Sequence, residues 1–202
     1  MIRPTRKWRL AGAAFASLLL VGCMSAPPVP DDHFYRLPPA QVTALPAPLF
    51  KGVLAVDRPR SDDLHGERAM LFVRAERPLE LNRYHYYFWV DTPPHLIQEQ
   101  LRLTLQSAGV AARVVRADGG PAPDVVLRSR LVRFERVLRK GGAYASVALE
   151  FSVARANGEP GWSKAYADVE PAQGDDVHAT VQAFGVALQR IYGRLLHDLA
   201  SR

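Results

Sequence analysis

Residues 143–156, AYASVALEFSVARA, alternate apolar and polar side chains, and this stretch decides the fold that we predict for the chain. Successive side chains of a β-strand point to opposite faces of a sheet, so residues 143–156 form a strand with one apolar face. The apolar face consists of Ala145, Val147, Leu149, Phe151 and Val153. The opposite face consists of Tyr144, Ser146, Glu150 and Ser152. Another element of the chain must pack against this apolar face to shield it from water.

Two further strands flank this one, at residues 125–138 and 162–169. Gly141-Gly142 and Asn157-Gly158 lie at the two junctions, and such pairs adopt the positive φ angles of tight hairpin turns. The sequence therefore predicts an antiparallel three-stranded meander.

A C-terminal helix can cover the meander. It is predicted to begin near Asp175-Asp176, whose carboxylates suit an N-cap and the positive end of the helix dipole. Apolar residues then recur every three or four positions, which places them on one face of a helix. They are Val181, Phe184, Leu188, Ile191, Leu195 and Leu199.

A second amphipathic helix is predicted over residues 93–107. Thr92 can accept amide hydrogen bonds as its N-cap, Pro93 suits the first helical position, and Gly109 can end the helix. Its apolar stripe is Ile97, Leu101 and Leu105.

The remaining apolar runs are strand candidates at 33–37, 50–57, 68–74, 79–90 and 110–116, with a turn at Arg77-Pro78. Together these elements predict an α+β fold, in which a single layered domain has an antiparallel or mixed β-sheet covered by two amphipathic helices. A chain of 202 residues with 48% apolar residues is large enough to bury such a core.

The predicted strand 79–90 contains five aromatic side chains within residues 84–89. Strict alternation places Tyr84, Tyr86 and Phe88 on one face, and His85, Tyr87 and Trp89 on the other. Such a strand has core on both sides, or one face of it contacts a partner protein or a lipid tail. The sequence leaves both alternatives open.

The N-terminus has the features of a bacterial export signal. Four basic residues precede an apolar run that ends at Val21, and Val21-Gly22 stands directly before Cys23, the one cysteine of the chain. The run is shorter than the ~20 residues that cross a bilayer. We predict a lipoprotein signal peptide at 1–22, lipidation of Cys23, a proline-rich tether at 23–32 and a folded domain at 33–202.

The charge balance argues against nucleic acid as a partner. The formal charge is +6, but four of these charges belong to the predicted signal peptide, which leaves about +2 on the mature chain. No disulfide is expected, because Cys23 has no second cysteine to pair with.

No catalytic or metal-binding motif is apparent. The six histidines are scattered, and the sequence contains neither a Gly-x-Ser-x-Gly elbow nor a phosphate loop. The densest ionisable cluster is Asp62, Asp63, His65 and Glu67, which is more typical of a solvated loop than of a cation site. We therefore expect no enzyme activity, no metal and no cofactor.

A basic run follows in residues 128–140. In a regular strand Arg128, Arg130 and Arg136 share the outward face, where they can contact acidic lipid headgroups or the acidic face of a partner. The alternative is a solvated sheet face on which Glu135 and Glu150 pair with these arginines.

Several of these features together resemble a known family. They are the lipobox at Cys23, Phe34-Tyr35-Arg36-Leu37, residues 53–59 (VLAVDRP), Arg83-Tyr84 and Trp89 before the Pro93-Pro94 helix, and Gly174-Asp175-Asp176 between the last hairpin strand and the last helix. On these residues the chain resembles the ABC-type transport auxiliary lipoproteins, a group that includes the outer-membrane lipoprotein of the paraquat-inducible intermembrane transport system. The resemblance covers nearly all of the mature chain.

This resemblance implies a non-catalytic accessory subunit of an intermembrane lipid transport system. Its partners would be a cytoplasmic ATPase, a permease and a periplasmic protein of the mammalian-cell-entry type, on which it would dock. Met24, rather than aspartate, follows Cys23, so we expect the lipid anchor to lie in the outer membrane, on its periplasmic face. The resemblance also makes a homo-oligomeric ring conceivable. The alternative is a lipid carrier that holds hydrophobic cargo in a cavity lined by Tyr84, Tyr86 and Phe88.

Overall fold

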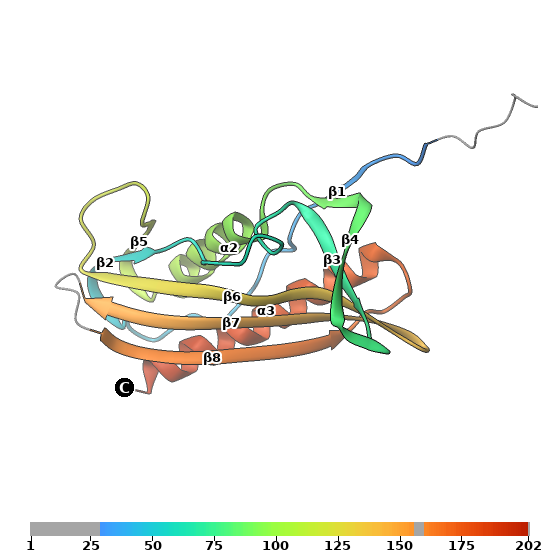
Figure 1. The fold of residues 1–202 in the computed structure, drawn as a ribbon. Helices are drawn as coiled ribbons and strands as arrows, with labels where there is room; N and C mark the ends of the chain where they lie inside the picture. Colours follow the sequence, from blue (N-terminus) through green and yellow to red (C-terminus); the bar gives the residue numbers. More distant parts are fainter. Residues whose placement is uncertain (1–28, 156–159, 202) are drawn as a thin grey trace, which may run out of the picture. The chain divides into compact units, whose positions relative to one another are not determined.

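The structure, a computed structural model, describes residues 29–155 and 160–201. Cys23 with its lipobox and the predicted Asn157-Gly158 turn lie outside the described residues. Residues Asp32–Arg202 form one unit, in which eight strands make a mixed sheet and two helices pack against it (Figure 1). The predicted α+β fold is confirmed.

Three long strands form the antiparallel meander: β6 (Val125–Arg139), β7 (Gly142–Arg155) and β8 (Pro160–Pro171). The predicted apolar face of β7 is buried, because Ala145, Val147, Leu149 and Phe151 are at most 1% exposed. Gly141 and Gly142 have φ angles of 93° and 154°, as the predicted turn requires. Among the described strands β8 pairs only with β7, so it is an edge strand.

The other strands join β6 on its opposite side, in the order β1-β4-β3-β6-β2-β5. Their bounds are β1 His33–Tyr35, β2 Phe50–Val56, β3 Ala69–Arg74, β4 Arg77–Trp89 and β5 Ala111–Arg116. β2 runs parallel to β5 and to β6, and β3 runs parallel to β6. The β3–β4 turn lies at Ala75-Glu76, two residues before the predicted position, and Figure 1 shows this hairpin leaving the meander at a steep angle.

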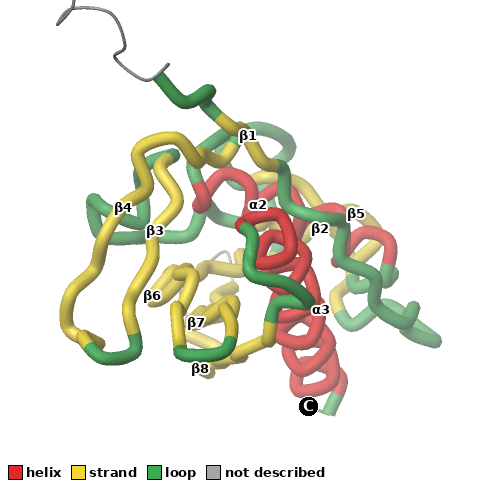
Figure 2. Tube along the Cα trace, turned by 90° about the vertical axis from the view of Figure 1, so that its right-hand side faces the viewer, coloured by secondary structure: helices red, strands yellow, loops and turns green. Residues whose placement is uncertain are grey.

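Both helices pack on the same face of the sheet. α2 (Pro93–Ser107) and α3 (Val177–Ala200) lie beside each other in Figure 2 and share one apolar core with β7. The buried Tyr192 hydroxyl of α3 donates to Oε1 of Gln100 in α2 at 3.1 Å. Neither of these described helices is long and apolar enough to cross a membrane.

The two helix starts differ from each other. Asp176 caps α3 as predicted, since its Oδ1 accepts a 2.6 Å hydrogen bond from the amide of Ala179. For α2 the structure confirms Thr92 as the N-cap position and Pro93 as the first helical residue, but the predicted hydrogen bond is wrong, because the Thr92 side chain makes none. The Asp91 side chain accepts the Thr92 amide at 2.7 Å and contacts Nδ1 of His95 at 2.5 Å.

A β-bulge changes the faces of β6 halfway along its length. Leu131 lies opposite Leu149, but the residue opposite the neighbouring Ala148 is Arg133, so Val132 is extra. An extra residue moves every later side chain to the other face. Inward positions are therefore odd-numbered before the bulge and even-numbered after it.

This bulge separates the three arginines that the sequence placed together. Arg128 and Arg130 are exposed, as predicted, whereas Arg136 lies after the bulge and is only 7% exposed. The prediction that all three share the outward face is wrong for Arg136. Alternation counted along the sequence does not reveal an inserted residue.

A larger irregularity interrupts β4 within its aromatic stretch. Leu71 pairs with Arg83 and Ala69 with Phe88, so two steps along β3 correspond to five along β4. Strict alternation therefore fails here, and the rings of Tyr84 and Tyr87, predicted on opposite faces, meet edge-on at 5.2 Å. The prediction that Tyr84 and Tyr87 lie on opposite faces is wrong for this reason.

Candidate functional site

An open groove of about 600 Å³ lies at the junction of β1, β3 and β4. Its lining includes Phe34, Arg68, Arg83, Tyr84 and Phe88, and we call it the aromatic groove. Two of the three aromatic residues predicted as a contact surface, Tyr84 and Phe88, line it. Tyr86 is 36% exposed and is not among the lining residues.

Aromatic stacking and two arginines hold the aromatic groove in shape. Phe34 stacks on Phe88 with ring centroids 5.6 Å apart, because β1 and β4 pair in parallel at these residues. The Arg68 guanidinium lies 5.4 Å from the Phe34 ring, and its Nε donates to the Trp89 carbonyl at 3.1 Å. Arg83 pairs with Glu67 at 3.3 Å. The groove thus presents apolar rings beside charged groups of both signs, because Asp32 and Glu67 line it together with the two arginines.

Tyr84 also separates the aromatic groove from a buried arginine. Its hydroxyl accepts a 2.8 Å hydrogen bond from Nη1 of Arg136, and Nη2 of Arg136 donates to the Asp175 carbonyl. Nε of Arg136 has no hydrogen-bond partner among the described residues. Burying a charge among neutral partners raises the free energy of the folded state. The loss of either hydrogen bond of Arg136 should therefore destabilise the protein. Regular strand alternation does not predict this contact, because the bulge at Val132 turns Arg136 inward.

The other two predicted arginines remain on the outward face of β6. Arg130 forms a bidentate pair with Glu150 of β7, at 2.8 and 2.6 Å. These hydrogen bonds lower the pKa of Glu150 and raise that of Arg130. Part of the basic run is therefore paired across the sheet. This agrees with the alternative prediction of a solvated sheet face on which Glu150 pairs with these arginines.

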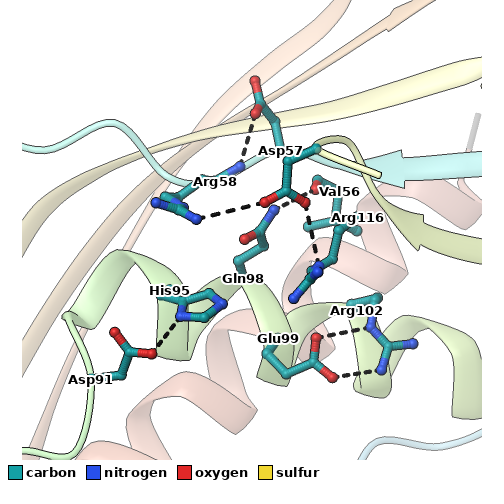
Figure 3. A network of polar contacts seen from close by, with 10 residues as sticks. Val56, Asp57, Arg58, Asp91, His95, Gln98, Glu99, Arg102 and Arg116 are labelled. Carbon is teal, nitrogen blue, oxygen red and sulfur yellow. Dashed lines mark hydrogen bonds and ion pairs between the residues drawn. The ribbon is translucent and has the colours of Figure 1, made fainter. Parts of the chain in front are cut away.

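A polar network, missed by the sequence reading, surrounds the first half of α2 (Figure 3). Gln98, which is fully buried, donates from Nε2 to the Val56 carbonyl at 3.0 Å and ties the helix to the end of β2. On the surface of α2, Glu99 accepts two hydrogen bonds from Arg102, at 3.0 and 2.6 Å, which lower the pKa of Glu99. Burial opposes ionisation of Asp91, but hydrogen bonds from the Thr92 amide and His95 outweigh it and lower the pKa of Asp91.

Arg58 and Arg116, both labelled in Figure 3, each pair with the carboxylate of Asp118, at 3.6 and 3.3 Å. These groups pair with one another and link the chain just after β2 to the end of β5. Pairs of this kind are expected at a structural junction, and no nucleophile and base converge here as catalysis requires.

The acidic cluster around His65 also serves the fold. His65 is 4% exposed, with Nδ1 2.8 Å from Oδ2 of Asp62 and Nε2 3.3 Å from Oε1 of Glu135 in β6. Burial disfavours the imidazolium, but the two carboxylates outweigh burial and raise the pKa of His65. Glu67, the fourth residue of the predicted cluster, instead forms an ion pair with Arg83. Among the described residues no three His, Cys, Asp or Glu side chains gather as metal ligands do.

Comparison with known proteins gives a family and a fold. The family model described as "ABC-type transport auxiliary lipoprotein component" matches residues 35–195. A search of curated proteins returns no match.

Three solved structures share the fold at low sequence identity. A Xanthomonas campestris protein, XCC0632, described under the family model DUF330, is 21% identical, with a TM-score of 0.70 over 81% of this chain and 92% of its own. An uncharacterised protein is 12% identical, with a TM-score of 0.67 over 84% and 99%. The hypothetical protein CT253 from Chlamydia trachomatis is 10% identical, with a TM-score of 0.51 over 74% and 96%. These similarities establish the architecture and no more.

Proposed function

Because the chain belongs to the family of ABC-type transport auxiliary lipoproteins, we propose that it is a non-catalytic accessory subunit of an intermembrane lipid transporter. Members of a lipoprotein family are membrane-anchored envelope proteins. In this proposal Cys23 carries the lipid, the anchor lies in the outer membrane, and the folded domain extends into the periplasm. There it docks on a protein of the mammalian-cell-entry type, while the ATPase and permease are other chains.

The aromatic groove is the observation that carries the docking proposal. Phe34 is 54% exposed beside Phe88, and Tyr86 is 36% exposed on the same strand as Phe88. Aromatic side chains and arginine are enriched at protein interfaces, and exposed apolar patches of this kind mark contact surfaces. Arg68 and Arg83, with Asp32 and Glu67, give the groove the mixed apolar and charged character of such a surface.

The ionisable groups support binding rather than catalysis. The carboxylates of Asp62, Asp91 and Glu99 pair with neighbouring His65, His95 and Arg102. Paired groups of this kind stabilise loops and helix ends. None of these three carboxylates is free to act as a general base.

Site-specific photo-crosslinking in cells tests the docking proposal. The crosslinker p-benzoylphenylalanine replaces Phe34, which lines the groove and is 54% exposed, in one strain and Leu103 in another, since Leu103 is 53% exposed on α2 and does not line the groove. We expect an adduct with the mammalian-cell-entry protein from position 34 and none from position 103. Equal adducts from both positions, or none from position 34 when all transporter subunits are present, would contradict docking through this surface.

A second candidate function rests on the volume of the same groove. A hollow of about 600 Å³ lined by Tyr84 and Phe88 is in the range of small-ligand sites, so the domain itself can carry a lipid. Native mass spectrometry of the detergent-extracted lipoprotein separates the two functions. A bound lipid that is lost in Phe88→Asp but retained in Leu79→Asp, at the fully exposed Leu79, favours the carrier. Absence of lipid from the wild type favours docking.

A further inference from the structure

A second hollow of about 260 Å³ lies where the chain beyond β2 meets the meander. Its lining includes Arg60, Arg128 and Arg130 together with Ser152 and Ser163, and we call it the basic groove. The aromatic groove has none of these residues in its lining, and of the residues labelled in Figure 3 only Asp57 lines the basic groove.

Backbone hydrogen bonds fix Arg60 beside β6. Its amide donates to the Ser129 carbonyl at 2.9 Å, and its own carbonyl accepts from the amide of Leu131 at 2.7 Å. These bonds make a parallel bridge between Arg60 and Arg130. Directly paired residues of a sheet project from the same face, so both guanidinium groups are on the outward side.

Strand register brings two hydroxyl groups to the same place. Arg128 is two residues before Arg130, so their side chains share a face. Arg128 lies opposite Ser152 of β7, and Ser152 lies opposite Ser163 of β8. A row of one guanidinium and two hydroxyls therefore crosses the sheet next to Arg60.

The charges of the basic groove are not balanced. Glu150 holds Arg130 in the bidentate pair, whereas Arg60 and Arg128 make no ion pair among the described residues. Asp57 is the other carboxylate at the groove, and its Oδ1 accepts the amide of Arg58. Three arginines and two carboxylates in the lining leave one positive charge in excess. Like charges on adjacent strands repel each other, so an anion between Arg60 and Arg128 would relieve this repulsion.

We propose that the basic groove binds a phosphate group. A guanidinium forms two parallel hydrogen bonds to phosphate oxygens, and serine hydroxyls add further donors. The exposed Ala165, Ala167 and Val169 of β8 continue the same outward face, where they can contact acyl chains. The phosphate is that of a lipid headgroup or of a free phosphate ion, and the two sources share this chemistry.

Calorimetric titration of the full-length lipoprotein in dodecyl maltoside, a detergent without phosphate, tests the site. Inorganic phosphate is titrated at constant ionic strength into the wild type, Arg60→Gln, Arg128→Gln and Arg133→Gln. Arg133 is the matched control, because it is exposed on β6 but is not part of the groove. We expect Arg60→Gln and Arg128→Gln each to weaken binding by about tenfold or more, since each loses a charge-assisted contact, and Arg133→Gln to leave it unchanged.

Dihexanoyl phosphatidic acid and dihexanoylglycerol distinguish the sources. Tighter binding of phosphatidic acid than of inorganic phosphate identifies a lipid headgroup, and equal binding identifies free phosphate. The proposal is overturned if the wild type binds neither phosphate probe, if dihexanoylglycerol binds as tightly as phosphatidic acid, or if Arg133→Gln loses as much affinity as the groove variants. No transporter subunit is present in this measurement, so its outcome is independent of the docking proposal.

Discussion

Nη1 of Arg136 lies 2.8 Å from the Tyr84 hydroxyl and donates a hydrogen bond to it, joining β6 after its bulge to the irregular stretch of β4. The same guanidinium donates to the Asp175 carbonyl just before α3. One buried side chain therefore connects two strands and the start of a helix. The two residues are 52 positions apart in the sequence, so this link is a tertiary one.

Removal of the Tyr84 hydroxyl should destabilise the domain. In Tyr84→Phe the buried Arg136 loses a partner, and we expect the free energy of unfolding to fall by about 1–3 kcal/mol. Tyr86→Phe is the matched control, because the more exposed Tyr86 should change it by less than about 0.5 kcal/mol. Urea denaturation followed by tryptophan fluorescence measures both, and equal effects would show that the Arg136 contact contributes nothing.

Two glycines of α3 should respond to alanine with opposite signs. A Cβ on Gly185 would lie 2.9 Å from Cβ and Cγ of the rigid Pro38 ring, so Gly185→Ala should overpack the contact, at a cost of about 1–3 kcal/mol. A Cβ on the exposed Gly193 would meet nothing within 4 Å, and Gly193→Ala should stabilise the helix by about 0.5–1 kcal/mol. Thermal unfolding compares the two variants, and a gain in Gly185→Ala would rule out the close packing of Pro38 on α3.

The buried His65 should make stability depend on pH. Its pKa is raised in the folded state, so the imidazolium between Asp62 and Glu135 stabilises the fold fully below about pH 6.5, the unfolded value. This contribution is lost as the pH rises through the folded pKa. The free energy of unfolding should therefore fall more steeply above pH 6.5 in the wild type than in His65→Gln.

His178→Gln provides the control for this experiment, because His178 is exposed on α3. The free energy of unfolding of His178→Gln, measured by denaturation at a series of pH values, should fall with pH as steeply as that of the wild type. Identical slopes for the wild type and His65→Gln would mean that His65 does not hold its proton more tightly in the folded state.

The predicted lipid anchor can be tested at two adjacent residues. Cys23→Ser removes the thiol that takes the lipid, so the protein should be released or stall unprocessed. Met24→Asp should hold the lipoprotein in the inner membrane, if the residue after the cysteine controls sorting as we expect. Membrane fractionation measures both, and Met24→Asp protein that stays in the outer-membrane fraction would contradict the sorting prediction.

Local periodicity was sufficient to predict the main elements. The helix predicted at residues 93–107 has those bounds in the structure, and the Gly141-Gly142 turn joins β6 to β7. Both depend on side chains within one turn or one hairpin, where sequence spacing fixes which groups meet. The apolar face of β7 was predictable for the same reason.

Features that depend on distant strands were not predictable. The extra Val132 and the stretched register of β4 show only in the pairing with neighbouring strands, so the faces of Arg136 and Tyr84 were misassigned. The parallel pairing of β2 with β5 and β6 also has no local signal. The two grooves therefore emerged only with the tertiary structure.

The edge strand β8 also affects the tendency of this protein to aggregate at high local concentration. An exposed edge can recruit strands from other chains and start aggregation. Here Pro160 and Pro171 bound the strand and have no amide hydrogen to donate, while Nη2 of Arg194 donates to the carbonyl of Ala167 at 2.9 Å. The edge therefore lacks two amide donors at its ends and has one carbonyl already occupied near its middle, which leaves fewer backbone groups to pair with a strand of another molecule.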